Sequence, residues 1–230
     1  LLPSTLAVGE GRVRLGGDWH PVARDFNANL EATALHWPPA GPPQARVPAA
    51  AVSLAGRPDD YRLEVSARLE GPDFPATTLA GAGRGGLDSL AIEHLRLETL
   101  DGVVEGAGRV AWAPALAWEA RLAARDLDPG RQWPEWPGRL GARLETRGAR
   151  AAERPLELEA RIDLLDGILR GYPVGGAGRL VLRDGQGRVE GIELRSGAAR
   201  FSADGGFGER LDLRWSLRAP ELPELLPTLA

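Results

Sequence analysis

The sequence predicts an all-β protein built as one long amphipathic antiparallel sheet. Three observations predict this: apolar and polar residues alternate along most of the chain, Asp-Gly dipeptides separate strand-like runs, and helix signals are weak. Strict alternation puts every second side chain on the same face of a strand, so each run has one apolar face and one polar face. Asp-Gly favours type I′ hairpin turns because both residues tolerate a positive φ.

The alternating runs follow one another from residue 61 to residue 218. In chain order, their apolar positions are Tyr61, Leu63, Val65, Ala67 and Leu69, then Val110, Trp112, Leu116, Trp118, Ala120 and Leu122, then Leu156, Leu158, Ala160, Ile162 and Leu164, and finally Leu211, Leu213, Trp215 and Leu217. Each run predicts a strand with one apolar face.

Turn and loop residues divide these runs. Hairpin turns are predicted at the four Asp-Gly pairs that begin at Asp101, Asp166, Asp184 and Asp204. Proline-containing stretches at 37–43, 71–75 and 133–137 predict wider loops, because proline lacks the N–H that a strand ladder needs. Single short helical turns are predicted at 126–130 and 220–227.

Two kinds of internal similarity suggest a sheet that grows by adding similar hairpins. Gly-Ala-Gly-Arg occurs at 81–84, 106–109 and 176–179, each time beside strand-like sequence, and the run 116–121 is echoed at 213–218. The repeats are too degenerate for a strict solenoid.

Composition excludes several function classes. The chain of 230 residues has no cysteine, so disulfides, thiolate metal sites and cysteine nucleophiles are absent. A net charge of −4 gives no electrostatic case for nucleic acid as a partner. The first residue is not methionine, no basic and apolar signal peptide is visible, and no apolar run is long enough for a membrane helix. We therefore expect a fragment of a longer protein.

Motifs that could carry chemistry have simpler interpretations. Residues 81–86 match G-x-G-x-x-G, but no helix pattern follows, so the glycines are interpreted as marking bulges or close backbone approach. The three histidines are scattered, and most carboxylates alternate with arginine on the polar phase. Trp133 and Trp136 are expected to cap the sheet edge in preference to forming a carbohydrate platform. We expect no enzyme, no metal and no cofactor.

Several degenerate motifs follow one another along the chain: the run 116–130, its continuation 133–140 with two Trp-Pro-type turns, the Leu-x-Gly step at 169–171, and the strand and Ser-Gly turn at 189–197. In this order they resemble the TamB family. The resemblance covers residues 50–229 and is looser in 1–50. The membrane helix and the terminal region of the family have no counterpart here, which suggests a place in the N-terminal half of the long periplasmic part.

The resemblance implies a fold, a function and a location. The family, with the wider AsmA-like group, implies a single elongated and strongly curved sheet over 1–230, an open gutter or β-taco with an apolar interior. Phospholipid acyl chains, or detergent, would bind in that interior. The protein would bridge the inner and outer membranes for lipid transport and would have a role in outer-membrane protein and autotransporter assembly. The implied location is the periplasm, within a single-pass inner-membrane protein of a Gram-negative bacterium. The implied protein partner is the outer-membrane protein TamA, through regions outside this chain.

The apolar phase supplies the candidate groove residues. Two acyl chains contain about 30 methylenes together, and exposing them to water costs roughly 25 kcal/mol. Only a continuous apolar trough can offset this cost. Small inward residues, such as Ala120, Ala160, Ala203 and Gly205, favour an open trough over a filled core. The predicted lining is Leu63, Val65, Leu69, Leu95, Leu97, Val110, Trp112, Leu116, Trp118, Leu122, Leu140, Leu144, Leu156, Leu158, Ile162, Leu164, Leu180, Leu182, Ile192, Leu194, Phe201, Leu211, Leu213, Trp215 and Leu217.

Alternatives stay open at this stage. A closed β-sandwich would show the same alternation with its apolar face filled by its own side chains. An outer-membrane barrel and an adhesin stalk also alternate, although the runs are short for a barrel and the aromatic content is only 6%. A scaffold that docks nascent outer-membrane protein strands on its open edge is a further alternative.

Overall fold

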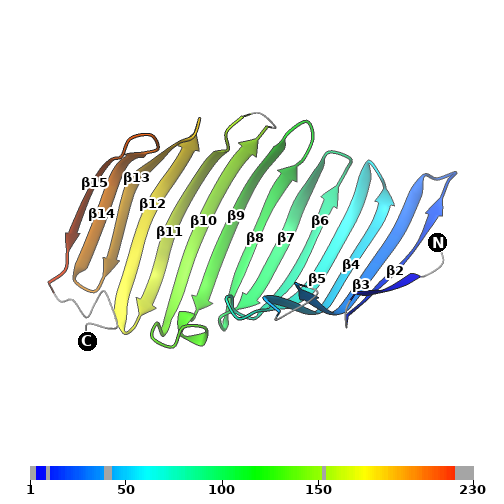
Figure 1. The fold of residues 1–230 in the computed structure, drawn as a ribbon, viewed down its shortest axis with the longest axis horizontal. Coiled ribbons are helices and arrows are strands. Elements are labelled where there is room, and N and C mark those ends of the chain that lie inside the picture. The colour runs from blue at the N-terminus through cyan, green and yellow to red at the C-terminus, as the bar shows by residue number, and fades with distance from the viewer. Residues whose placement is uncertain (1–3, 9–10, 39–42, 152–153, 221–230) are drawn as a thin grey trace. The chain divides into compact units, whose positions relative to one another are not determined.

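The protein is described by a computed structural model that covers residues 4–8, 11–38, 43–151 and 154–220. Its regular secondary structure there is all β-strand, apart from one short 3₁₀ helix. The strands are hydrogen-bonded in chain order, from β1 to β15, as an antiparallel meander (Figure 1). The predicted all-β, antiparallel fold is confirmed.

Contacts within the chain divide it into two units. The first contains residues 1–100 and 104–109, and the second contains residues 101–103 and 110–230. Strand β8 (Gly102–Ala111) contributes to both. The remaining strands of the first unit are β1 (Ser4–Val8), β2 (Gly11–His20), β3 (Asp25–Trp37), β4 (Ala45–Arg57), β5 (Asp60–Glu70), β6 (Thr77–Gly85) and β7 (Ser89–Thr99).

The second unit contains the short 3₁₀ helix η1 (Pro129–Arg131). Its remaining strands are β9 (Leu116–Leu127), β10 (Gly138–Arg150), β11 (Glu157–Leu169), β12 (Tyr172–Arg183), β13 (Gln186–Ser196), β14 (Ala199–Phe207) and β15 (Asp212–Arg218). Asp128 caps η1, because its Oδ1 accepts hydrogen bonds from the backbone N–H groups of Gly130 and Gly138. The short helical turn predicted at 126–130 overlaps η1, which begins at Pro129. The one predicted at 220–227 falls almost entirely outside the described residues.

Two of the four predicted Asp-Gly turns are hairpin turns. Asp184 and Gly185 connect β12 to β13 with φ of 50° and 74°, as a type I′ turn requires. At the first pair the turn is displaced by one residue, since the positive φ values belong to Leu100 and Asp101 and Gly102 already begins β8.

The predictions of turns at Asp166-Gly167 and Asp204-Gly205 are wrong. Both pairs lie inside strands, β11 and β14, where the neighbouring ladders continue. Gly167 follows a register shift between β11 and β12, and Gly205 lies opposite Leu213 with φ of 139°. In both cases glycine accommodates a distorted strand in place of a turn. The turn after β11 is formed by Arg170 and Gly171.

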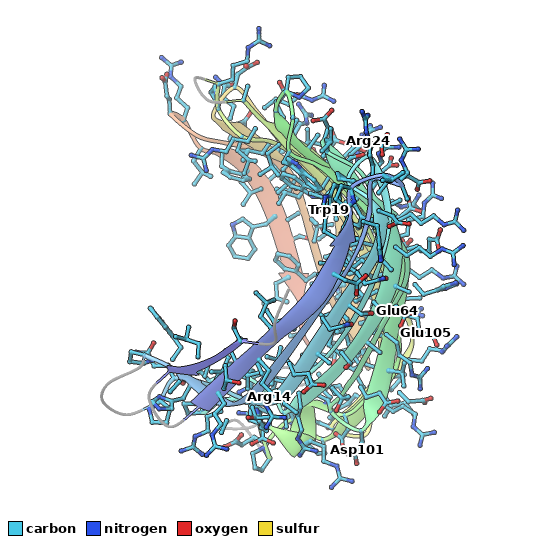
Figure 2. All side chains as sticks on the ribbon, turned by 90° about the vertical axis from the view of Figure 1, so that its right-hand side faces the viewer. Arg14, Trp19, Arg24, Glu64, Asp101 and Glu105 are labelled. Carbon is cyan, nitrogen blue, oxygen red and sulfur yellow. The ribbon has the colours of Figure 1, made fainter. Side chains whose placement is uncertain are left out.

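Strands of the first unit bend along their length. Figure 2 shows Glu64 and Glu105 toward the outer side of the bend, with Trp19 above them and Arg14 below. Since side chains alternate, Leu63 and Val65 face the side opposite to Glu64. The first unit therefore has a polar outer face and an apolar inner face.

Bulges accompany two of the Gly-Ala-Gly-Arg repeats. The register shifts between Ala82 and Gly83 where β6 pairs with β7, and between Ala177 and Arg179 where β12 pairs with β13. A side chain at Gly83 would overlap the carbonyl oxygen of Ala91, which shows how closely the two backbones approach. The interpretation of these glycines as bulge and close-approach positions is confirmed, and such bulges increase the bend of a strand.

The described residues contain no closed hydrophobic core. The buried apolar residues are Ala32, Val174, Ala199 and Ala203, and no large side chain is fully buried in the described ranges. A closed β-sandwich of this size would bury many leucine, isoleucine and aromatic side chains. The sandwich alternative is therefore wrong for the described part of the chain.

Candidate functional site

The apolar face of the first unit consists of rows of directly opposed residues. One row crosses six strands, from β2 to β7, through Leu15, Leu30, Val52, Val65, Gly81 and Leu95. The next row crosses the same strands through Val13, Ala32, Ala50, Ala67, Leu79 and Leu97. Directly opposed side chains on one face lie close enough to interact, so each row forms a strip without a polar side chain.

The second unit has the same construction. Leu122, Leu144 and Ile162 lie directly opposite one another on β9, β10 and β11. On β13, β14 and β15 the corresponding strip is Leu194, Phe201 and Leu217, beside a pair formed by Ala203 and Trp215. Glycine and alanine occupy many of the intervening positions, which lowers the height of the surface without adding a polar group.

Large side chains on this face are exposed. The exposed fraction is 51% for Ile162, 47% for Leu194 and 65% for Trp215. Single exposed apolar residues are ordinary on a protein surface, but a contiguous patch marks a binding surface for a ligand or a partner. The apolar face of each unit is therefore the candidate functional site.

Aromatic rings lie across glycines of the adjacent strand. A Cβ atom at Gly148 would overlap the Trp118 ring, one at Gly187 would overlap the Phe207 ring, and one at Gly85 would overlap the Tyr61 ring. Each ring therefore occupies the space above a glycine of the neighbouring strand. The indole N–H of Trp118 also donates to Oγ1 of Thr146 at 3.4 Å. The rings cover the sheet without filling the space above it.

Most of the predicted lining residues lie in paired strands, and some of them belong to the rows described above. Those in strands whose partners are resolved are Leu63, Val65, Leu69, Leu95, Leu97, Leu116, Trp118, Leu122, Leu140, Leu144, Leu158, Ile162, Leu164, Leu180, Leu182, Ile192, Leu194, Phe201, Leu213, Trp215 and Leu217. Val110 lies in β8, whereas Trp112, Leu156 and Leu211 lie just outside the strands that their runs predicted. These three positions follow or precede loops, where the alternation no longer reflects pairing.

Sequence reasoning missed the apolar positions of β2, β3 and β4. Leu15, Leu30, Val52 and Leu54 occupy the same rows as the predicted residues. The alternation is present in these strands, but alanine and glycine at the intervening apolar positions dilute it.

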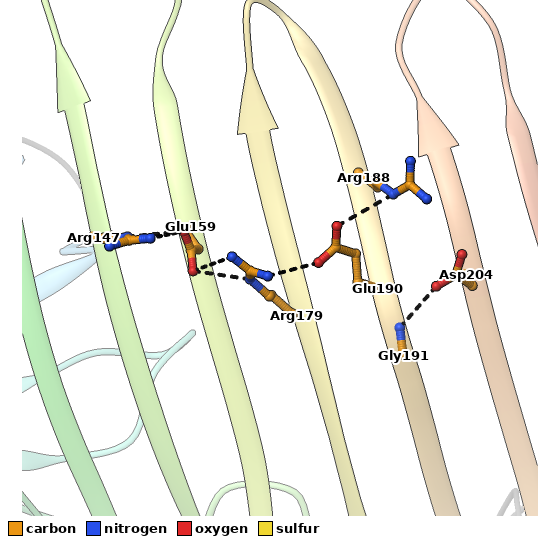
Figure 3. A network of polar contacts seen from close by, with 7 residues as sticks. All are labelled: Arg147, Glu159, Arg179, Arg188, Glu190, Gly191 and Asp204. Carbon is orange, nitrogen blue, oxygen red and sulfur yellow. Dashed lines mark hydrogen bonds and ion pairs between the residues drawn. The ribbon is translucent and has the colours of Figure 1, made fainter.

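The polar face of the second unit carries a chain of ion pairs (Figure 3). Arg147 and Arg179 both donate to Glu159, with closest distances of 2.6 Å and 2.7 Å, and Arg179 also donates to Glu190 at 3.1 Å. Arg188 continues the chain to Glu190 at 3.5 Å. Hydrogen bonds from Arg147 and then Arg179 lower the pKa of Glu159, against an opposing effect of burial. This network joins β10 to β13 and is structural.

A hollow of about 520 Å³ lies in the first unit and is lined by residues of five strands, from β3 to β7. The lining includes small residues such as Ala51, Ser66 and Ala80, and also Glu64 and Arg96. Arg96 is held by Glu98 at 3.1 Å and Glu105 at 2.8 Å. The lining mixes these charged residues with Leu30, Val52 and Val65, so the hollow is not purely polar.

The loop after η1 lies against the turn between β11 and β12. The backbone N–H of Arg170 donates to the carbonyl oxygen of Pro137 at 2.6 Å, and the Arg170 guanidinium lies 5.7 Å from the Trp136 ring centre. Trp136 is half-buried by this contact, whereas Trp133 is 47% exposed. Trp136 therefore lies at the ends of the strands, beside the turn that follows β11.

Within the described ranges, no group of three or more histidine, aspartate or glutamate side chains is arranged to hold a metal ion. None of the helical segments found there has the length and apolarity to span a bilayer.

An antiparallel β-sheet with a charged face and an uncovered apolar face defines the class: an open-faced amphipathic β-sheet protein. The family described as "TamB, N-terminal domain" matches residues 13–230. The chain therefore belongs to the TamB family.

Among characterised relatives, the chain is similar to the translocation and assembly module subunit TamB of Haemophilus influenzae (strain ATCC 51907 / DSM 11121 / KW20 / Rd). The two are 22% identical over 173 residues, which is 74% of this chain. The chain spans 13% of the length of that relative. No solved structure matches it.

Proposed function

We propose that this chain is a periplasmic segment of a translocation and assembly module subunit that acts in outer-membrane assembly, and that its apolar face binds phospholipid acyl chains. Family membership supports the role in assembly. The observation that carries the lipid proposal is the uncovered apolar face of each unit, with exposed Ile162, Leu194 and Trp215 in directly opposed rows.

Energetics favour acyl chains as the ligand. Each methylene removed from water contributes about 0.8 kcal/mol, so a face made of aliphatic and aromatic strips offsets the cost of moving a lipid tail through water. The strips run across the strands, and each strand adds one residue of similar apolarity. Glycine and alanine between the larger residues prevent a deep local minimum, which suits a tail that slides along the surface without being trapped.

The wider role follows from the family. In this proposal the longer protein is anchored in the inner membrane by a single span, bridges toward the outer membrane and meets TamA there through regions outside residues 1–230. No catalytic step is needed, because transfer is passive movement along the apolar face.

A charge placed on each face tests the lipid proposal. The purified protein is extracted with organic solvent, and phospholipid is quantified by mass spectrometry. Ile162→Asp puts a carboxylate in the apolar row between Leu144 and Gly178, so lipid loading is expected to fall at least severalfold. Arg161→Asp is the matched control, since Arg161 is the adjacent exposed residue on the polar face.

Loss of lipid in the Ile162 variant alone, with circular dichroism unchanged, supports the proposal. Equal loading of both variants and the original protein would overturn it.

The edge strand β15 favours a second candidate, a scaffold for nascent outer-membrane protein strands. In the described part of the chain β15 pairs only with β14, and all seven of its residues are exposed. An extended peptide can add to such an edge through backbone hydrogen bonds. Hydrogen exchange of the β15 amides with and without a peptide copied from an outer-membrane protein strand is the test: slower exchange supports docking, and unchanged exchange excludes it.

A further inference from the structure

Three arginines form a row on the polar face of the second unit. Arg195 on β13 lies directly opposite Arg200 on β14, and Arg200 lies directly opposite Arg218 on β15. Like charges placed directly opposite one another on adjacent strands are destabilising. The row contrasts with the nearby chain of ion pairs that begins at Arg147, where arginine and glutamate alternate.

None of the three guanidinium groups has a carboxylate partner among the described residues. Arg200 donates from Nη1 to the carbonyl oxygens of Gly197 and Ala199, at 2.8 Å each. The Arg195 head lies over Gly175 on the opposite side, where an added Cβ would be 2.5 Å from its Nε. The heads of Arg195 and Arg200 thus turn away from each other, as repelling cations do.

Among the described residues, the carboxylate closest to Arg195 along its own strand is Glu193. It lies two residues before Arg195 and directly opposite Ser202, and it makes no ion pair with any of the three arginines in the described structure. All three arginines are exposed. The row therefore presents unpaired positive charge to solvent.

The row lies where the strands end. Ser196 ends β13, Ala199 begins β14 and Arg218 ends β15. One residue away along each strand, on the opposite face, is the apolar strip of Leu194, Phe201 and Leu217. The Arg200 head already bends toward the turn at this rim. Arginine has a long apolar stem and can place its charge at the boundary between an apolar surface and water.

We propose that Arg195, Arg200 and Arg218 bind the phosphate of a phospholipid whose acyl chains lie on the adjacent apolar strip. The inference rests on the proposed acyl-chain function and adds a fixed position for the headgroup. A guanidinium matches phosphate oxygens with two parallel N–H donors, and the phosphate relieves the repulsion among the three cations. The headgroup would then lie at the rim formed by the end of β13, the start of β14 and the end of β15.

The test separates the phosphate from the acyl chains. Phosphatidylglycerol and diacylglycerol with the same fluorescent acyl chains are titrated onto the full chain. The original protein should bind phosphatidylglycerol about tenfold more tightly, the size of one charge-assisted contact. The triple variant Arg195→Gln, Arg200→Gln and Arg218→Gln should lose this preference and keep its affinity for diacylglycerol.

A matched control loses the same three charges elsewhere. Arg14, Arg62 and Arg183 are exposed arginines outside the row, and their replacement by glutamine should leave the preference unchanged. Equal affinity of the original protein for both lipids, or a preference that survives in the triple variant, would overturn the headgroup site and leave acyl-chain binding intact. If the Arg14, Arg62 and Arg183 variant also loses the preference for phosphatidylglycerol, the preference comes from general charge attraction, and the headgroup site is overturned. Binding of neither lipid would overturn the proposed function itself.

In a last titration, inorganic phosphate is added to the protein without lipid. Weak, salt-sensitive binding of phosphate supports a headgroup site that needs the acyl chains for affinity. Tight binding that disappears in the triple variant would identify free phosphate as the ligand and overturn the headgroup assignment.

Discussion

Arg179 on β12 donates two hydrogen bonds to Oε1 of Glu159 on β11, from Nη2 at 2.7 Å and from Nε at 3.1 Å. Arg147 on β10 contacts the other oxygen of the same carboxylate, at 2.6 Å and 3.0 Å. One glutamate therefore joins three strands. Paired hydrogen bonds of this kind are directional, so they favour one register among the three strands.

Neutralising Glu159 should change the pH dependence of stability. The arginine hydrogen bonds lower the pKa of Glu159 below its ordinary value of 4.5, so the unfolded chain binds this proton more readily than the folded one. The stabilisation that ionised Glu159 gives the folded state is therefore present above pH 4.5. It is lost as the pH falls through the lower pKa of the folded state. Urea unfolding of Glu159→Gln and the original protein, from neutral to acidic pH, should show a stability difference that shrinks on acidification. A difference that stays constant would contradict this role.

Adding a methyl group at Gly148 should destabilise the second unit. The Trp118 ring lies across Gly148, and a Cβ there would also be 2.7 Å from the carbonyl oxygen of Glu157. Gly148→Ala must displace the ring or the backbone, at an expected cost of about 1–3 kcal/mol in the free energy of unfolding.

Gly16→Ala is the control for this substitution. A Cβ at Gly16 meets nothing within 4 Å, so the variant should be neutral or slightly more stable in the same urea experiment. Equal destabilisation by both substitutions would show that loss of glycine, and not the overlap with Trp118, is responsible.

The Asp184-Gly185 hairpin should depend on backbone conformation alone. Gly185 has φ of 74° and an added Cβ would have no neighbour within 4 Å. Gly185→Ala should therefore cost about 1 kcal/mol through left-handed strain, without any packing change. Chemical denaturation measures the cost, and Gly185→Asn, which tolerates this region better, should cost less. Equal costs for alanine and asparagine would contradict the assignment to strain.

Shortening an apolar side chain on the open face should cost little. Ile162 is 51% exposed, so Ile162→Ala removes apolar area that is already half in water, at an expected cost below about 2 kcal/mol. Val174→Ala serves as the comparison, because Val174 is only 8% exposed although the substitution removes fewer carbons. Val174→Ala should cost at least as much in calorimetric or urea unfolding. A loss of 3–5 kcal/mol at Ile162, roughly that of a packed core, would show that its face is covered in solution.

Local sequence signals predicted strands more reliably than turns. Alternation from Leu211 to Leu217 placed Leu213, Trp215 and Leu217 on one face of β15, because side-chain period is a property of a single strand. Asp-Gly identified the turn at Asp184 but failed at Asp166 and Asp204, where pairing with the neighbouring strand continues. Glycine serves both tight turns and distorted strands, and the partner strand decides between them.

The sequence by itself determined that this protein is all β, that its strands are amphipathic and that it belongs with the TamB family, since periodicity and motif order are written along the chain. Only the tertiary structure decided which residues lie opposite each other and whether the apolar face is covered. Burial depends on what packs against a strand, and an open face and a filled core share the same alternation. The row of Arg195, Arg200 and Arg218 could not be predicted from the sequence either. Its three residues come from three strands and are brought together only by the register of the sheet.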